Sequence, residues 1–298
     1  MNDSRVTPAL DRRRLMVIFN PTAGRRRSKA LAQAIGLLEP QVDLTHRRTG
    51  ARGDAEAFAR GMPQGSIALV AGGDGTANEA ANGLLAAGGG EMAIIPLGTA
   101  NVLAAELGIL NIAGAAGAAA TGSLLTYRPG LDNGRAFLLM AGVGFDAHVV
   151  ANVSPRLKRL LGKGAYVVET LHQLWHFSFP RYRATVDGVV HEAASVIVAR
   201  GHFYGGRFVV APEARLDRDE LHVCLFHRGG RLQTILYALA LASGRLHRSR
   251  HVEIIKAQRV TIEGPVGDPV QGDGDLIARL PVTIELSPTS IGLRRPLA

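Results

Sequence analysis

The architecture follows from Ser66-Ile67-Ala68-Leu69-Val70-Ala71-Gly72-Gly73-Asp74-Gly75-Thr76-Ala77-Asn78-Glu79, an apolar run that leads into a glycine-rich turn. A buried strand that ends in glycines lets the backbone approach a bulky anion, because no side chain stands between the amide groups and the anion's oxygens. A glycine pair after a strand is often only a turn, but Asp74 follows this pair directly. A carboxylate beside bound phosphate repels it unless the carboxylate holds Mg²⁺ or handles a proton. The stretch therefore predicts a phosphate site in which Asp74 has a catalytic or metal-binding role.

The first half of the chain alternates short apolar runs with helical segments. Strands are expected at 15–19, 42–45, 67–70 and 92–95, and helices at 28–35, 53–59 and 78–85. This rhythm predicts an open parallel α/β sheet with helices on both faces, over residues 1–127. The loops after its strands carry polar or glycine residues: Asn20 with Gly24, Thr49 with Gly53, Gly72 to Thr76, and Gly98 to Asn101. These loops share the carboxyl edge of the sheet, so we expect them to meet in one ligand crevice.

The second half has a different character. Short, β-branched segments separated by Gly, Pro or Asp turns occur at 137–141, 183–186, 194–199, 221–226, 252–257, 259–263 and 282–286. Such spacing predicts an antiparallel β-sandwich domain over residues 128–287, interrupted by a helical stretch at 157–177. We expect residues 288–298 to return to the first domain.

Composition limits the class of protein. The 298 residues, 47% of them hydrophobic, suffice for one large domain or two ordinary ones. The single cysteine, Cys224, excludes a disulfide framework and fits a reducing compartment. Residues 1–10 lack the apolar core of a signal peptide, and no stretch is hydrophobic enough to span a membrane, so a cytoplasmic location is expected. The net charge of +9 implies an anionic partner: a nucleotide, nucleic acid or an acidic lipid surface.

Several motifs together resemble the catalytic domain of the diacylglycerol kinase family, which also includes sphingosine kinases, ceramide kinases and bacterial lipid kinases. The motifs are spread over nearly the whole chain, at 20–24, 72–84, 96–101, 142–147, 161–166, 204–206 and 271–275. The resemblance implies an ATP-binding α/β domain followed by a β-sandwich domain, with ATP in the cleft between them. It implies a kinase that uses ATP and Mg²⁺.

The resemblance also assigns roles to individual positions. The family's nucleotide-contacting residues are matched by Asn20, Thr49, Gly72, Gly73, Asp74, Gly75, Thr76 and Thr99, and we add Asn78, Glu79, Asp273 and Gly274 from the same motifs. The family's late Asp-Gly-Glu motif is matched by Asp273-Gly274-Asp275. Its last carboxylate is the proton acceptor in bacterial members, which makes Asp275 the expected base here. Asp74 would then hold Mg²⁺ with ATP and orient the phosphates, although in related eukaryotic kinases the early aspartate is often described as the base.

This chain departs from the family pattern at two positions. Asp275 is one methylene shorter than the usual glutamate, so its reach to a hydroxyl requires a water or a closed cleft. Members with a structural Mg²⁺ carry an Asp-Asp-Gly turn in the second domain, where this chain has Asp217-Arg218-Asp219. Asp217 is therefore the remaining candidate ligand for that ion, and Arg218 stands where a metal-binding aspartate would be.

The helical stretch at 157–177 combines apolar and basic side chains. A basic amphipathic helix of this kind lies on an anionic bilayer or simply turns its apolar side into the core. Trp175, Phe177 and Phe179 are the residues we expect to contact lipid, at the inner face of a membrane. The sequence leaves a homodimer open.

The sequence as a whole favours a kinase that phosphorylates the hydroxyl of a membrane lipid, diacylglycerol or a sphingoid lipid such as ceramide. Two alternatives stay open. NAD kinase shares the glycine-aspartate-glycine loop and the two-domain plan, so a kinase of a soluble substrate is the nearest alternative. A nucleotide-sensing or nucleic-acid-binding protein without catalysis is the other. We expect no nucleic-acid partner, because an aromatic content of 5% gives little support for a surface of interleaved aromatic and basic residues.

Overall fold

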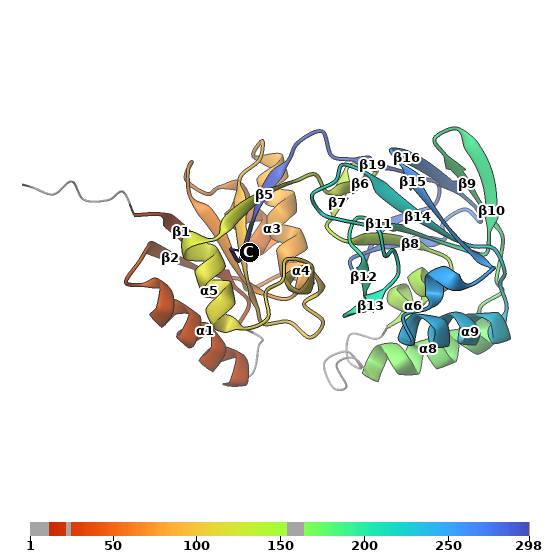
Figure 1. Cartoon of the computed structure of the whole chain (residues 1–298), viewed down its shortest axis with the longest axis horizontal. Helices are drawn as coiled ribbons and strands as arrows, with labels where there is room; N and C mark the ends of the chain where they lie inside the picture. Colours follow the sequence, from red (N-terminus) through yellow and green to blue (C-terminus); the bar gives the residue numbers. More distant parts are fainter. Residues whose placement is uncertain (1–11, 22–24, 154–163, 298) are drawn as a thin grey trace, which may run out of the picture.

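The computed structural model describes residues 12–21, 25–153 and 164–297, in two lobes that lie side by side (Figure 1). Gly24 and residues 157–163 of the expected helical stretch lie outside the described residues. In the described ranges no helix has both the length and the apolar character needed to cross a bilayer.

The first lobe is built on a six-stranded sheet in the order β2-β1-β3-β4-β20-β5. Its strands are β1 (Arg14–Phe19), β2 (Asp43–Arg48), β3 (Ile67–Gly72), β4 (Glu91–Pro96), β5 (Ser123–Tyr127) and β20 (Ile291–Arg295). The strands β2, β1, β3, β4 and β20 run parallel, and β5 closes the edge antiparallel to β20. The expected parallel α/β domain is therefore confirmed, with an antiparallel edge strand that the sequence did not suggest.

Helices cover both faces of this sheet. They are α1 (Arg25–Leu38), α2 (Asp54–Arg60), α3 (Asp74–Ala86), α4 (Val102–Glu106) and α5 (Ile112–Thr121). Helix α1 packs against α5 and α2 packs against α3, and Figure 1 shows α1 and α5 on one side of the sheet and α3 on the other. All six residues of β3 are buried between the two helical layers, which explains why this strand is a continuous apolar run.

Helix α3 begins earlier than the sequence suggested. It starts at Asp74 rather than Asn78, with Gly73 as its N-cap in an extended conformation. The backbone N–H of Ala77 makes a helical bond to the carbonyl of Gly73. The glycine-rich motif is thus the first turn of a helix, where backbone N–H groups point outward and the helix dipole favours an anion.

The second lobe consists of two six-stranded antiparallel sheets that face each other. One has the order β10-β9-β16-β19-β6-β7, and the other β15-β14-β11-β8-β17-β18. The strands are β6 (Gly130–Asp132), β7 (Arg135–Phe137), β8 (Met140–Val143), β9 (Tyr182–Val186), β10 (Val189–Ala193), β11 (Ser195–Ala199), β14 (Leu221–Phe226), β15 (Val252–Ala257), β16 (Arg259–Glu263), β17 (Pro269–Gly272), β18 (Asp275–Arg279) and β19 (Val282–Leu286). Inward side chains of both sheets form one apolar core, which confirms the expected antiparallel β domain.

Short elements complete the second lobe. The hairpin of β12 (Phe203–Tyr204) and β13 (Phe208–Val209) faces the first lobe, and α6 (Phe145–Asn152), α8 (Gly164–His176), α9 (Arg231–Ala242) and the 3₁₀ turn η1 (Leu246–Arg248) lie below the sheets in Figure 1. The segment expected as one strand at 137–141 is divided here, because β7 and β8 belong to different sheets.

A polar seam joins α3 of the first lobe to β7 of the second. Asn82 donates from Nδ2 to the carbonyl of Ala136 at 3.1 Å, and its Oδ1 accepts from the Ala136 N–H at 3.0 Å. Asn78 donates to the same carbonyl at 3.0 Å. Both asparagines are buried, so these bonds replace water at the contact and fix the position of one lobe on the other.

Two further contacts link the lobes. Arg135 of β7 pairs with Glu56 of α2, with 2.6 Å between Nη1 and Oε2. Glu106 at the end of α4 accepts the N–H of Phe203 at 2.7 Å and lies 2.8 Å from Nδ1 of His202. Burial raises the pKa of Glu106, and these partners from the second lobe favour its charged form.

Replacing Asn82 by alanine should destabilise the protein by about 1–3 kcal/mol, because the buried N–H of Ala136 loses its acceptor. The free energy of unfolding in urea measures the effect. The exposed Gln64→Ala is the matched control and should leave stability unchanged. Equal stability of both variants would show that the seam does not hold the lobes together.

Candidate active site

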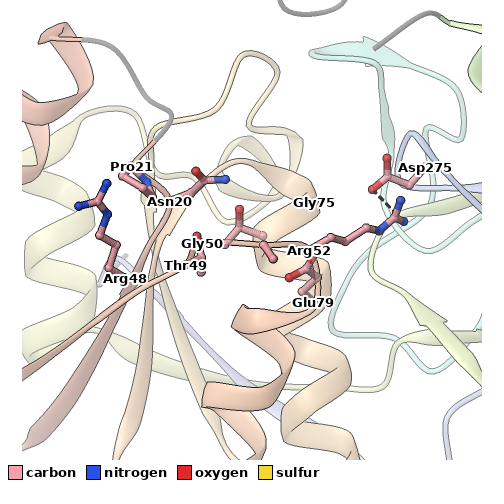
Figure 2. Close-up of a pocket in the computed structure, with 11 residues that line it drawn as sticks. Asn20, Pro21, Arg48, Thr49, Gly50, Arg52, Gly75, Glu79 and Asp275 are labelled. Atoms are coloured by element: carbon pink, nitrogen blue, oxygen red, sulfur yellow. Dashed lines mark ion pairs between the residues drawn. The ribbon is translucent and has the colours of Figure 1, made fainter.

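A cavity of about 810 Å³ opens between the two lobes at the carboxyl edge of the first sheet (Figure 2). It is lined by Asn20, Pro21, Arg48, Thr49, Gly50, Ala51, Arg52, Gly75, Thr76, Glu79 and Asp275. Six of these residues were predicted from the sequence: Asn20, Thr49, Gly75, Thr76, Glu79 and Asp275. The cavity therefore gathers the ends of β1 and β2, the first turn of α3 and one carboxylate of the second lobe.

Two glycines allow neighbouring turns to meet beside this cavity. A Cβ atom on Gly98 would lie 2.4 Å from the Cα of Gly73, and one on Gly73 would lie 3.1 Å from the Cα of Gly98. The Gly98 turn is held by Asn101, whose Oδ1 accepts the Gly98 N–H at 2.7 Å. The contact between the two backbones leaves no room for a Cβ at Gly98 and makes one at Gly73 tight.

Four predicted residues are not among those that line the cavity and instead support its turns: Gly72, Gly73, Asp74 and Thr99. Oδ1 of Asp74 accepts the N–H of Leu103 at 3.1 Å, at the start of α4. Thr99 accepts from Nη2 of Arg27 at 3.3 Å, and a Cβ on Gly72 would clash with the Thr76 side chain. Asp74 thus joins the first turn of α3 to the segment after β4.

The late acidic motif is the turn of a β-hairpin. Asp273 and Gly274 are the two residues between β17 and β18, and both have positive φ, 51° and 86°. A two-residue turn of this kind requires positive φ at both positions, for which Asp-Gly is a preferred sequence. Asp275 is the first residue of β18, and a Cβ on Gly75 would lie 3.6 Å from its Oδ2. The hairpin therefore brings Asp275 against the first turn of α3.

The carboxylate of Asp273 is occupied by four N–H donors. The backbone N–H groups of Leu138, Leu139 and Met140 donate at 2.6, 2.8 and 3.1 Å, and Nδ2 of Asn78 donates at 2.9 Å. Burial raises the pKa of Asp273 to about 6, while the hydrogen bonds from these donors favour its charged form. Asp273 and Asn78, which the sequence assigns to nucleotide binding, are bonded to each other and fix the hairpin on α3, and neither is among the residues that line the cavity.

A second half-buried carboxylate, that of Asp146, supports the same hairpin. Nε2 of Gln271 donates to Oδ2 of Asp146 at 3.0 Å, while Oε1 of Gln271 accepts the Gly274 N–H at 3.0 Å. Burial raises the pKa of Asp146 to about 6. Asp146 therefore orients Gln271, and Gln271 holds the turn that precedes Asp275.

Two arginines of the cavity were not predicted from the sequence. Arg48 ends β2, and Arg52 follows it in the loop to α2. Nη2 of Arg52 lies 3.7 Å from Oδ2 of Asp275, and Figure 2 shows it reaching toward the second lobe. The basic run Arg47-Arg48 beside the predicted Thr49 was the available signal. These cations provide the positive charge that bound phosphates require.

The loop that contains Asp217 does not fit a metal ion. The fully buried guanidinium of Arg200 donates to the carbonyls of Arg218 and Glu220, both at 2.7 Å, and to that of Arg128 at 2.9 Å. The carbonyls that could surround a cation therefore already surround an arginine. Asp217 is exposed, and within the described ranges no three His, Cys, Asp or Glu residues cluster as metal ligands would.

Of the three aromatic residues expected to contact lipid, Trp175 is exposed, Phe177 is buried and Phe179 is half-buried. Phe177 is buried, with its ring centroid 5.8 Å from that of Phe145 and 5.0 Å from that of Phe179. Phe179 also stacks on Phe145. The run of aromatic residues after α8 is thus an internal cluster, which its short spacing in the sequence did not reveal.

The arrangement is suited to phosphoryl transfer between two substrates. Backbone N–H groups at the start of α3 and two arginines can hold phosphates, and a carboxylate stands opposite them. This two-lobed plan defines a kinase of the diacylglycerol kinase type.

Two family models match the chain. Residues 14–128 match the model of the diacylglycerol kinase catalytic domain, and residues 140–295 match that of the YegS C-terminal NAD kinase beta sandwich-like domain. The chain belongs to the diacylglycerol kinase family of lipid kinases.

Relatives and solved structures agree with this assignment. The chain is 32% identical to a probable YegS-like lipid kinase of Pseudomonas aeruginosa over 95% of its own length and 94% of the relative's. It is 27% identical to a diacylglycerol kinase of Bacillus subtilis over 90% of its own length and 92% of the relative's. The crystal structure of a candidate diacylglycerol kinase from Bacillus anthracis superimposes with a TM-score of 0.76 at 25% identity, covering 96% of this chain and 97% of that one.

Gly98→Ala should abolish or strongly weaken nucleotide binding, because the new methyl group would force the Gly98 and Gly73 turns apart. Isothermal titration with ATP measures the affinity. Gly36→Ala is the matched control, since a Cβ at this position of α1 meets nothing within 4 Å. An unchanged affinity in Gly98→Ala would contradict the contact between the turns.

Arg200→Met should lower the free energy of unfolding by about 3 kcal/mol or more, because it leaves several buried carbonyls without a donor. Arg259→Met, which removes an exposed ion pair with Glu285, is the control and should change the free energy of unfolding little.

Because the guanidinium of Arg200 takes the place of a cation, EDTA should leave the Tm of the native protein unchanged. A clear drop in Tm with EDTA would show that the lobe does bind a structural metal.

Proposed function

We propose that this protein is an ATP-dependent lipid kinase that transfers the γ-phosphate to the hydroxyl of a membrane lipid, diacylglycerol or a sphingoid lipid such as ceramide. The observation that carries the proposal is the approach of Asp275 to Gly75 across the cavity between the lobes. One side of the cavity offers N–H donors and cations, and the other side offers a carboxylate.

The nucleotide end lies on the first lobe. The phosphates of ATP would accept from the N–H groups of Gly75 and Thr76 at the positive end of α3. Arg48 and Arg52 line the same space and would neutralise phosphate oxygens. Thr49 is buried, and its backbone N–H donates to the carbonyl of Phe19 at 3.0 Å. Thr49 therefore forms a fixed part of the cavity wall.

The acceptor end depends on Asp275. Its carboxylate would take the proton from the lipid hydroxyl while the hydroxyl oxygen bonds to the γ-phosphorus. The bond from that phosphorus to the bridging oxygen breaks, and ADP leaves with the electron pair. A positioned general base contributes roughly 10²- to 10⁴-fold to such a step.

Carboxylates suitable for the Mg²⁺ of an ATP complex are present at this edge of the sheet. Glu79 lines the cavity beside Gly75, and Asp74 is the next residue along the chain from the glycine pair. Oxygen ligands of this type fit Mg²⁺, which would supply charge neutralisation at the transferred phosphoryl group. Glu79 would hold the ion together with the phosphates, and Asp74 would contribute the oxygen that does not accept the Leu103 N–H.

The lipid acceptor places the proposed reaction at a membrane surface, on the cytoplasmic side. Labelled ATP should therefore transfer its γ-phosphate to vesicles that contain diacylglycerol, ceramide or sphingosine, and identification of the labelled product would name the substrate. Label found only in NAD would favour the soluble-substrate kinase. No transfer to any acceptor, with ATP still bound, would favour a nucleotide-binding protein without catalysis.

Asp275→Asn should lower kcat for the accepted lipid by roughly 10²- to 10⁴-fold and leave ATP affinity nearly unchanged, because the amide cannot accept the proton. Asp43→Asn is the matched control: this exposed aspartate starts β2, at the opposite edge of the sheet. If Asp275→Asn retained the native kcat, Asp275 would not be the base and Asp74 would be the next candidate.

A further inference from the structure

Helices α8 and α9 expose apolar side chains along their outer faces. On α9 the exposed residues are Leu232, Ile235, Leu236 and Leu239, and on α8 they are Val167, Val168, Leu171 and Trp175. Each set recurs every three or four residues, so each forms a single stripe along its helix. These eight residues are about half of the 17 large apolar side chains that are exposed in the described part of the chain.

The stripes are separate from the faces that pack into the protein. Tyr237 of α9 turns inward, where its ring meets Phe226 and its hydroxyl donates to the carbonyl of His251 at 3.1 Å. Leu174 and Gln173 of α8 are buried on the inner side of that helix. The inner faces account for the packing of both helices, so the outer stripes are not core residues left partly uncovered.

One side chain joins the two helices into a single surface. The guanidinium of Arg231, the first residue of α9, lies over the ring of Trp175 at 4.7 Å, and its Nη2 donates to the Trp175 carbonyl at 3.0 Å. Figure 1 shows α8 and α9 side by side at the lower end of the second lobe. We call their eight exposed apolar residues together the α8–α9 face.

The α8–α9 face has a basic border. Arg231 stands at one end of α9, and the exposed Arg245, Arg248 and Arg250 follow its other end in and around η1. The sequence contains no Asp or Glu between Glu220 and Glu253. The acidic Glu169 of α8 points inward, with a side chain only 14% exposed that bonds to Gln173.

We propose that the α8–α9 face docks on an anionic lipid bilayer, with its apolar stripes in the acyl boundary and its arginines on the headgroups. Exposed leucines and a tryptophan beside a run of arginines are complementary to such a surface. The lipid supplied in this way would be the acceptor of the proposed kinase, so in that respect the inference rests on the proposed function.

A second copy of the chain fits this face less well. A symmetric dimer would bring the same patch of each subunit together, so the arginines at the ends of α9 would meet one another. Glu253, the nearest acidic residue after η1, already lies 2.9 Å from Nε2 of His227. Like charges at such a contact are unfavourable. The border therefore selects an anionic surface as the occupant.

The single tryptophan of the chain makes the test direct, because Trp175 lies on the proposed contact. The full-length protein without ATP would be titrated with phosphatidylcholine vesicles that do or do not contain phosphatidylglycerol. We expect a blue shift of the emission and quenching by brominated acyl chains with the anionic vesicles, and weaker binding at high salt. Leu232→Glu and Leu236→Glu should each lower the partition coefficient roughly tenfold or more.

Val266→Glu is the matched control, since Val266 is 93% exposed on the second lobe but lies outside α8 and α9, and it should bind vesicles as the native protein does. Thermal unfolding of all three variants would exclude a folding defect. Equal binding of Leu236→Glu and Val266→Glu would overturn the proposal, as would a native protein that stays off the vesicles and self-associates through this face. Since the vesicle assay contains no ATP, loss of docking and loss of phosphoryl transfer are scored independently.

Discussion

The arrangement of the candidate active site depends on one half-buried carboxylate, that of Asp273. Asp273 accepts three backbone N–H groups from the β7–β8 segment and the side chain of Asn78 from α3. One ion thus holds together the hairpin of the second lobe and the helix of the first. A charged acceptor bonds more strongly than a neutral one, and four donors offset the cost of removing it from water. The position of Asp275, two residues further along, follows from this contact.

The division of chemistry between the lobes follows from their folds. A parallel sheet gathers the N-terminal end of α3 and the loops after its strands at one edge, which suits it to phosphates. It offers few places for a base that must face those phosphates from outside. A hairpin turn of the second lobe fills this position, since β17 and β18 end over α3. The Asn78–Asn82 seam and the Arg52–Asp275 pair bridge the same gap, so the start of α3 and Asp275 are positioned together.

The sequence predicted the parts governed by local patterns. The strands β14, β15, β16 and β19 have the bounds that alternation and turn residues indicated, and the glycine motif lies where a phosphate turn was expected. Helix α3 was predicted too short because its first turn contains glycines, which are poor helix formers but can supply its N-cap. The antiparallel edge strand and the division of 137–141 depend on pairings between distant segments, which local patterns do not encode.

The rest of the site depended on such distant pairings. The backbone groups that bond to Asp273 precede it by 133 to 135 positions in the sequence, and Asn78 precedes it by 195. The part that Asp273 and Asn78 play in joining the lobes could therefore not be seen in the sequence. Arg200 lies 72 residues from Arg128, whose carbonyl it binds. Phe177 turned out to be buried for the same reason, since Phe145 reaches it from another helix. In each case the residue type was visible, while its partner was set by the tertiary fold.

A crystal structure with a non-hydrolysable ATP analogue and Mg²⁺ would show whether the nucleotide binds between the lobes. We expect phosphates against the N–H groups of Gly75 and Thr76, arginine contacts from Arg48 or Arg52, and a terminal phosphate that faces Asp275. A nucleotide bound elsewhere, or phosphates directed away from the hairpin of β17 and β18, would contradict this expectation.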